Sequence, residues 1–266
     1  MKPPIESVNL KTIMKLTILG SGTIVPDGSR NSSGYFVELP DARIMLDCGA
    51  GTLHALARYQ LPWEQMTHLF VSHFHADHIG ELASLLFAFS YGTKTTRSKP
   101  FTIIGPHGLQ GVLDALETAF GGKLLKTKFP LNMRMLGPDE ALQLGNESEL
   151  SVCKTLHTAE SLAVRIDANN HSLCYTGDTA YSEALVDFFN GADALISECS
   201  FREPRDYVRH LSVSEAARLA ARANVSTLIL THFYFDVDEE HLEAEVQKEY
   251  SGNIIVGRDG YSLELK

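Results

Sequence analysis

The sequence predicts an α/β fold in which two sheets pack together and helices cover their outer faces. The chain has 266 residues, 44% of them hydrophobic and 21% charged, as in ordinary globular proteins. Its β-rich runs come first as hairpins and later alternate with helical segments, which favours two sheets over a doubly wound parallel sheet. No Pro-, Ser- or Gly-rich linker divides the chain. We therefore expect a single domain over residues 1–266.

The individual elements follow from short apolar runs and from the residues that end them. Pro40–Ala42 predicts a hairpin turn, and Ser212–Glu215 has the pattern of a helix capping box. Strands are expected at 15–19, 34–39, 43–47, 68–72, 101–104, in a meander of four strands over about 130–176, and at 194–197, 227–230 and 253–256. Helices are expected at 52–59, 79–90, 108–120, between Ser182 and Gly191, and at 213–223.

Charge and cysteine content exclude several classes of protein. The net charge of −10 means that the protein as a whole does not attract nucleic acid, which is itself negatively charged. The 4 cysteines are too few and too scattered for a disulfide scaffold, and none forms a CxxC pair, which excludes a zinc ribbon. No apolar run reaches the roughly 18 residues that cross a membrane, and the N-terminal segment lacks the apolar core of a signal peptide. We expect a cytoplasmic protein with reduced thiols and no membrane partner.

The strongest signal for function is the segment His73-Phe-His75-Ala-Asp77-His78, which directly follows the strand expected at 68–72. Imidazole and carboxylate groups together suit Zn²⁺, Mn²⁺ or Fe²⁺. Because alternate side chains of such a loop can turn to different sides, His73 and His75 could face one metal ion and Asp77 and His78 a second. A polar turn with incidental histidines is the alternative, and the density of ligand-type groups disfavours it.

One loop cannot complete two metal sites, so further ligands are expected where later strands end. His157, Asp178 and His232 each follow a β-rich run. Taken singly, each is a weak signal, because a histidine after a strand is more often a hydrogen-bonded structural residue. Taken together, they supply the groups that the first loop lacks.

This ordered set, HFHADH, a single His, TGDT and LTHF, resembles the motifs of the metallo-β-lactamase superfamily over residues 15–260. The resemblance implies a four-layer αββα sandwich with two divalent metal ions at one edge of the sheets. It implies that His73, His75 and His157 hold one ion, that Asp77, His78 and His232 hold the other, and that Asp178 bridges them. Zinc is the expected metal, with manganese and iron as alternatives. Asp47 is expected to orient a ligand, with a simple turn carboxylate as the alternative.

His75 also bears on the reaction type, because the flavin-linked di-iron oxidoreductases of this fold carry glutamate at the matching position. The chain is therefore expected to be a hydrolase in which a hydroxide shared by the two metals attacks the substrate.

Within the superfamily, the chain resembles the ribonuclease Z branch in Leu19–Gly22, Leu46–Gly49, Ile196–Phe201 and Arg209–Glu215. That branch has a His-Glu-Ala-Thr segment and a His-Ser-Thr segment. Here Glu198 and His210 are retained, although Ser197 stands in place of the first histidine. His210 could protonate a leaving oxygen while Glu198 fixes its tautomer. The alternatives are a flanking histidine and a salt-bridge carboxylate. Asp77, Glu198 and His210 are the candidate catalytic residues.

One departure bears on the substrate. The tRNA-processing enzymes carry a basic arm, which the bacterial form inserts between the residues that match His157 and Asp178. Here that segment has room for only one hairpin and no arm. We expect a phosphodiesterase for small cyclic or nucleotide phosphodiesters or RNA, with tRNA disfavoured. A hydrolase of carbonyl esters (lactone, thioester or β-lactam) and a non-catalytic carrier or binding protein are the alternatives. The resemblance also implies a homodimer.

Overall fold

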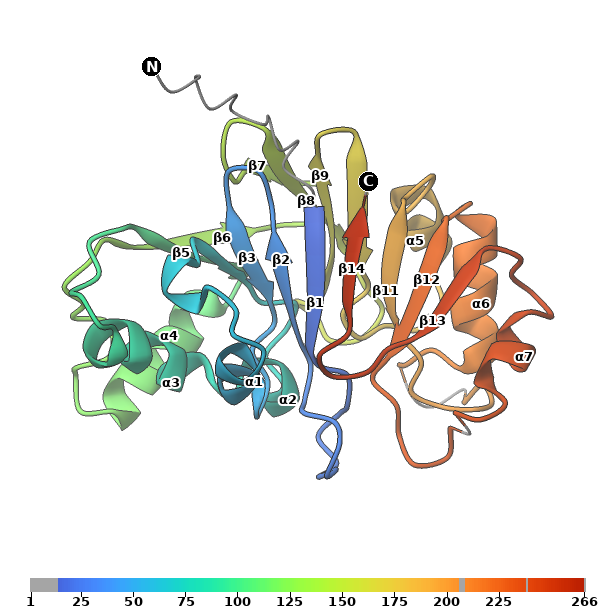
Figure 1. Cartoon of the computed structure of the whole chain (residues 1–266), viewed down its shortest axis with the longest axis horizontal. Helices are drawn as coiled ribbons and strands as arrows, with labels where there is room; N and C mark the ends of the chain where they lie inside the picture. Colours follow the sequence, from blue (N-terminus) through green and yellow to red (C-terminus); the bar gives the residue numbers. More distant parts are fainter. Residues whose placement is uncertain (1–13, 206–208, 238, 266) are drawn as a thin grey trace, which may run out of the picture.

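Two sheets packed face to face form the centre of the structure, and helices cover the outer face of each (Figure 1). The computed structural model describes residues 14–205, 209–237 and 239–265. The expected four-layer αββα sandwich is therefore confirmed for these ranges. The domain predicted from residue 1 begins in a segment, 1–13, that lies outside the described residues.

The first sheet has seven strands among the described residues, in the order β14-β1-β2-β3-β4-β5-β6. The strands β14, β1, β2 and β3 pair antiparallel, and β3 to β6 pair parallel. Their bounds are β1 (Met14–Gly20), β2 (Gly34–Glu38), β3 (Arg43–Leu46), β4 (His68–Phe70), β5 (Phe101–Pro106), β6 (Leu131–Leu136) and β14 (Ser262–Leu265).

The second sheet also has seven strands in the described ranges, in the order β13-β12-β11-β10-β9-β8-β7. The strands β7 to β10 form an antiparallel meander, and β10 to β13 run parallel. Their bounds are β7 (Ala141–Gln143), β8 (Ser148–Lys154), β9 (Leu162–Ala168), β10 (His171–Tyr175), β11 (Ala194–Glu198), β12 (Thr227–Thr231) and β13 (Asn253–Val256).

Three apolar layers hold the sandwich together. Between the sheets, Val37 and Ile44 of the first sheet share one buried cluster with Val164 and Ile196 of the second. Each such side chain stabilises the fold by about 1.5–3 kcal/mol through its burial. Two further clusters join each sheet to its helices.

The helices divide between the two outer faces (Figure 1). On the first sheet lie α1 (Thr52–Arg58), the 3₁₀ turn η1 (Trp63–Gln65), α2 (Ala76–Ile79), α3 (Leu82–Phe87), the π-helical turn η2 (Ala88–Gly92) and α4 (Leu109–Ala119). On the second lie α5 (Glu183–Phe188), α6 (Val213–Arg222) and α7 (Leu242–Val246). The capping box expected at the start of α6 is present, with Ser212 and Glu215 bonding each other's backbone N–H groups.

Two expectations about the elements are wrong. The expected meander over 130–176 includes β6, but β6 pairs parallel with β5 in the other sheet, so the four meander strands are β7 to β10. The helix expected over 79–90 is broken between α2 and α3. There the carbonyl of His78 accepts from the amide of Cys48, and the amide of Glu81 donates to the carbonyl of Cys48, which replaces the continuing helical bonds.

Candidate metal centre

The candidate ligands gather where strands of both sheets end. Asp178 and His232 follow β10 and β12, which run parallel to β11 between them, so their carboxyl ends meet at one edge of the second sheet. His73 follows β4 of the first sheet by a short extended segment, and His75 is the residue just before α2. The packing of the two sheets therefore brings together residues that are far apart in the sequence.

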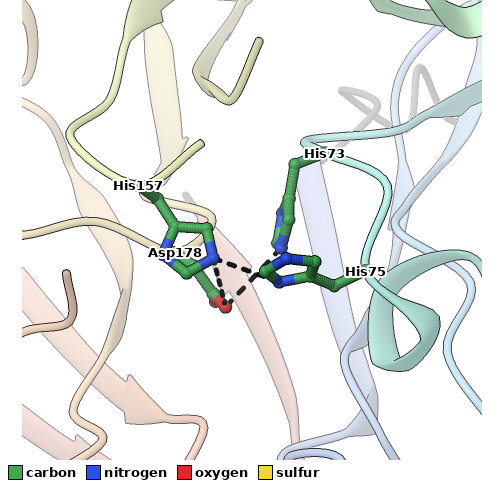
Figure 2. A group of neighbouring side chains, drawn as sticks. All are labelled: His73, His75, His157 and Asp178. Carbon is green, nitrogen blue, oxygen red and sulfur yellow. Dashed lines mark hydrogen bonds and ion pairs between the residues drawn. The ribbon is translucent and has the colours of Figure 1, made fainter. Parts of the chain in front are cut away.

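The first group consists of His73, His75, His157 and Asp178, whose ligand atoms all lie within 4.8 Å of one another. Figure 2 shows His73 and His75, which share one loop, converging with His157 and the carboxylate of Asp178 from other loops. Oδ2 of Asp178 lies 3.7 Å from Nε2 of His73 and 3.8 Å from Nε2 of His157. Nε2 of His157 lies 3.1 Å from Nδ1 of His75.

The second group consists of Asp77, His78 and His232, again within 4.8 Å of one another. The other oxygen of Asp178, Oδ1, lies 3.3 Å from Nε2 of His78 and 3.4 Å from Nε2 of His232. Oδ2 of Asp77 lies 3.4 Å from Nε2 of His232. The two oxygens of Asp178 thus face two different groups, which is the arrangement that a bridging carboxylate requires.

These residues fit a pair of divalent metal ions. Nε2 of His73, His78 and His232 and Oδ1 of Asp178 are buried, and none has a hydrogen-bond partner. Buried polar atoms without partners are costly, so the gathering of four of them at this sheet edge needs an explanation. Imidazole nitrogen and carboxylate oxygen are the donors that Zn²⁺, Mn²⁺ and Fe²⁺ accept, and two such ions, one in each group, would satisfy all four atoms.

The electrostatics of the centre favour an ionised carboxylate at Asp178, a neutral ring at His73 and a charged ring at His78. Burial acts to raise the pKa of Asp178, but the charges of His232 and His78 hold it well below its ordinary value. Burial and the neighbouring His78 lower the pKa of His73 well below its usual range. Burial acts to lower the pKa of His78, but Asp178 and Asp47 raise it well above that range.

Asp47 contacts the candidate ligand His78, as expected from the sequence. Its Oδ2 lies 2.7 Å from Nδ1 of His78 and accepts from the hydroxyl of Tyr175 at 2.8 Å. Its Oδ1 accepts from the amide of Ser72 at 2.7 Å. The residue is fully buried and has a positive φ of 54°, a conformation that Asp tolerates better than most residues. Asp47 therefore fixes the orientation of the His78 ring.

Glu198 and His210 form an ion pair at the border of the centre. Nδ1 of His210 lies 3.0 Å from Oε2 of Glu198 and 3.8 Å from Oδ2 of Asp178. Glu198 is buried and also accepts from the amide of Thr179. Burial acts to lower the pKa of His210, but the charge of Glu198 and its hydrogen bond raise that pKa to about 9. The contact expected between the two residues is present.

Sequence reasoning missed several groups around the ligands. It did not single out the hydroxyls of Ser72, Ser200 and Tyr175, although all three bond carboxylates or rings of the centre. Ser72 directly precedes His73, and that position is the only signal in the sequence. The backbone carbonyl of Arg209 lies 2.9 Å from Nδ1 of His157. Because every residue has such a carbonyl, the sequence could not indicate this contact.

A hollow of about 250 Å³ lies beside the centre, between the loop after β1 and the loop after β12. Phe233, Tyr234 and Phe235 line one side of it, and Gly22 lies on the other. The ring of Tyr234 lies 5.9 Å from that of His232, so the hollow adjoins the second group. In the described ranges, no helix is long and apolar enough to cross a membrane.

An αββα sandwich with two groups of histidine and aspartate at one sheet edge defines a metallo-β-lactamase-fold protein of the metallo-hydrolase class. Comparison with known families narrows this class. Residues 14–251 match the family described as Anti-Pycsar protein Apyc1, and the chain belongs to this family.

Known relatives agree with this class. The probable metallo-hydrolase YhfI of Bacillus subtilis is 30% identical over 254 residues, covering 94% of this chain and 100% of YhfI. Its crystal structure matches with a TM-score of 0.83 at 28% identity, covering 96% and 100% of the two chains. A ribonuclease Z of Mycobacterium bovis is 28% identical over 277 residues, covering 95% and 99%. Human tRNase Z, short form, shares the fold, with a TM-score of 0.76 at 21% identity over 94% and 98%.

Proposed function

We propose that this metallo-hydrolase is a phosphodiesterase that cleaves small cyclic or nucleotide phosphodiesters, or RNA. The observation that carries the proposal is the Glu198–His210 pair. It places a histidine, held by a buried carboxylate, 3.8 Å from the central Asp178. An acyl hydrolase has no evident task for such a pair, whereas a phosphodiester needs a proton for its leaving oxygen. The ribonuclease Z among the relatives is consistent with this choice.

In this proposal, His73, His75 and His157 hold one divalent ion, and Asp77, His78 and His232 hold the second. Asp178 lies between them with one oxygen toward each group. When bound, two such ions supply Lewis acidity and lower the pKa of water toward neutrality. Zinc is the first choice of metal, and manganese and iron remain alternatives, because the donor set accepts all three.

The chain's own residues then direct the proton. A carboxylate only accepts hydrogen bonds, so Nδ1 of His210 donates its proton to Glu198. Nε2 of His210 is consequently the atom that can release a proton to the leaving oxygen. Glu198 keeps the ring in place and stabilises its charged form, while Asp77 supports His232 on the opposite side of Asp178.

The size of the substrate follows from the segment between His157 and Asp178. This segment forms only a loop and the β9–β10 hairpin, whose strands pair in register from His171 with Ala168 to Tyr175 with Val164. The net charge of −10 adds no attraction for a long polyanion. We therefore place small phosphodiesters ahead of tRNA as substrates.

A substrate series on the zinc-loaded protein tests the proposal. We expect hydrolysis of bis(p-nitrophenyl) phosphate, cyclic nucleotides or short RNA, and we expect His210→Ala to lower that rate by about 10²–10⁴-fold. His54→Ala, at an exposed position on α1, is the matched control and should leave the rate unchanged. A preference for lactones, thioesters or β-lactams that does not depend on His210 would overturn the proposal in favour of an acyl hydrolase. Bound metal without any hydrolysis would point to a carrier.

A further inference from the structure

Two buried serines connect carboxylates to histidines of the centre, one on each sheet. The Oγ atom of Ser72 lies 2.7 Å from Oδ2 of Asp47 and 3.0 Å from Nδ1 of His73. The Oγ atom of Ser200 bonds Oε2 of Glu198 and lies 2.9 Å from Nδ1 of His232. Both serines are fully buried, so no bulk water competes for these contacts.

Counting the protons fixes the direction of each contact. A serine hydroxyl has one proton, and a carboxylate can only accept. Each serine therefore donates to its carboxylate, and its oxygen accepts from Nδ1–H of the histidine. In a neutral ring this leaves Nε2 without a proton. Nε2 of His73 and His232 are the buried, unpartnered atoms that face Asp178, at 3.7 and 3.4 Å.

The same two carboxylates also hold a second ring directly. Asp47 contacts Nδ1 of His78 at 2.7 Å, and Glu198 contacts Nδ1 of His210 at 3.0 Å. Each carboxylate thus holds one histidine by itself and one through a serine. The first set follows β3 and β4, and the second lies at the end of β11, so the device is repeated on the two sheets.

We propose that Ser72 and Ser200 are positioning residues that hold His73 and His232 in the Nδ1–H tautomer, with Nε2 presented to a metal ion. This inference rests on the metal centre of the proposed function. It goes beyond the ligand set because the tautomers of two ligands, His73 and His232, are set by serine hydroxyls that are not themselves ligands.

Metal affinity is the first test. Zinc alone is titrated calorimetrically into chelator-stripped protein, and Ser72→Ala and Ser200→Ala should each weaken binding about 10- to 100-fold. Ser200→Thr retains a hydroxyl and should recover part of the loss. Ser197→Ala is the matched control, because Ser197 is buried on β11, three residues before Ser200, but donates to the backbone carbonyl of Glu198. It should bind as the wild type does.

Ring tautomers are the second test, and they need no metal. In nitrogen-15 spectra of the stripped protein in mildly alkaline buffer, Ser200→Ala should move the ring signals of His232 and not those of His73. Ser72→Ala should do the reverse. Should an alanine variant not fold, cysteine at the same position fills the space with a poor donor and carries the same test.

Unchanged tautomers together with unchanged zinc affinity in folded variants would overturn the inference. A wild-type protein that binds no zinc would instead overturn the proposed metal centre. The tautomer signals would still decide the role of the serines, so the two failures are distinguishable.

Discussion

Replacing Asp47 by asparagine tests how much the buried carboxylate behind His78 contributes to the fold. The new amide would keep the shape of the side chain, and asparagine also tolerates the positive φ of 54° at this position. The substitution therefore isolates the loss of an acceptor and a charge. Alanine would add backbone strain to the same loss.

The magnitude follows from the four contacts of the carboxylate. Oδ1 accepts from the amide of Ser72, and Oδ2 contacts the hydroxyls of Ser72 and Tyr175 and Nδ1 of His78. Whichever way the new amide is turned, its NH₂ group faces at least one donor. At the Oδ1 position it leaves the Ser72 amide and itself unpaired. Each unpaired buried donor costs about 1–3 kcal/mol, so for two of them we expect a loss of about 2–6 kcal/mol in the free energy of unfolding.

Urea unfolding of the metal-free variant and wild type, followed by circular dichroism, measures this loss. Asp187→Asn, at an exposed position on α5, is the matched control and should change the free energy of unfolding by less than about 0.5 kcal/mol. A loss below about 1 kcal/mol for Asp47→Asn would show that the buried donors around this residue do not depend on its carboxylate as their acceptor.

Three further predictions concern other parts of the molecule. Burial lowers the pKa of His68 to about 4 from an ordinary value of 6.5. Between pH 6.5 and about pH 4, His68 is therefore protonated in the unfolded chain and neutral in the folded protein. The free energy of unfolding consequently falls as the pH drops through this window, by up to about 3 kcal/mol. His68→Gln should flatten that slope in pH-dependent denaturation, and an unchanged slope would contradict the assignment. Ser212→Ala should cost about 1 kcal/mol by removing the capping box of α6, whereas Ser182→Ala, at an N-cap whose side chain makes no capping bond, should cost less. Equal losses in urea unfolding would argue against the box. Zinc should raise the melting temperature of stripped protein, by the equivalent of about 4 kcal/mol at about 1,000 times its dissociation constant; a melting temperature independent of zinc would count against the centre.

The sequence was most informative where ligand-type residues follow strands. Parallel strands end at a common edge, so the positions of Asp178 and His232 after β-rich runs already implied that they would meet. The dense loop from His73 to His78 supplied four of the other five residues, and His157, after another β-rich run, is the fifth. Their roles as metal ligands stay predictions, although the geometry places every one of them at the centre.

Pairing between distant segments was less predictable. The strand β6 has an alternating, partly exposed pattern that suits a meander as well as a sheet edge. Its partner β5 is separated from it by α4, and the local sequence of β6 does not indicate which strand it pairs with. The serine contacts share this difficulty, since Ser72 and Ser200 acquire their meaning only from carboxylates that other segments bring to them.

The position of β14 has a consequence for how the protein is made. This strand is the last described one along the chain, yet it lies beside β1, with Leu263 opposite Leu16. During translation, β1 therefore keeps one side of its backbone unpaired until Ser262–Leu265 has been synthesised. An open strand edge is a template for aggregation. Chains that terminate early on the ribosome would expose this edge permanently, and chaperone demand should be highest for such products.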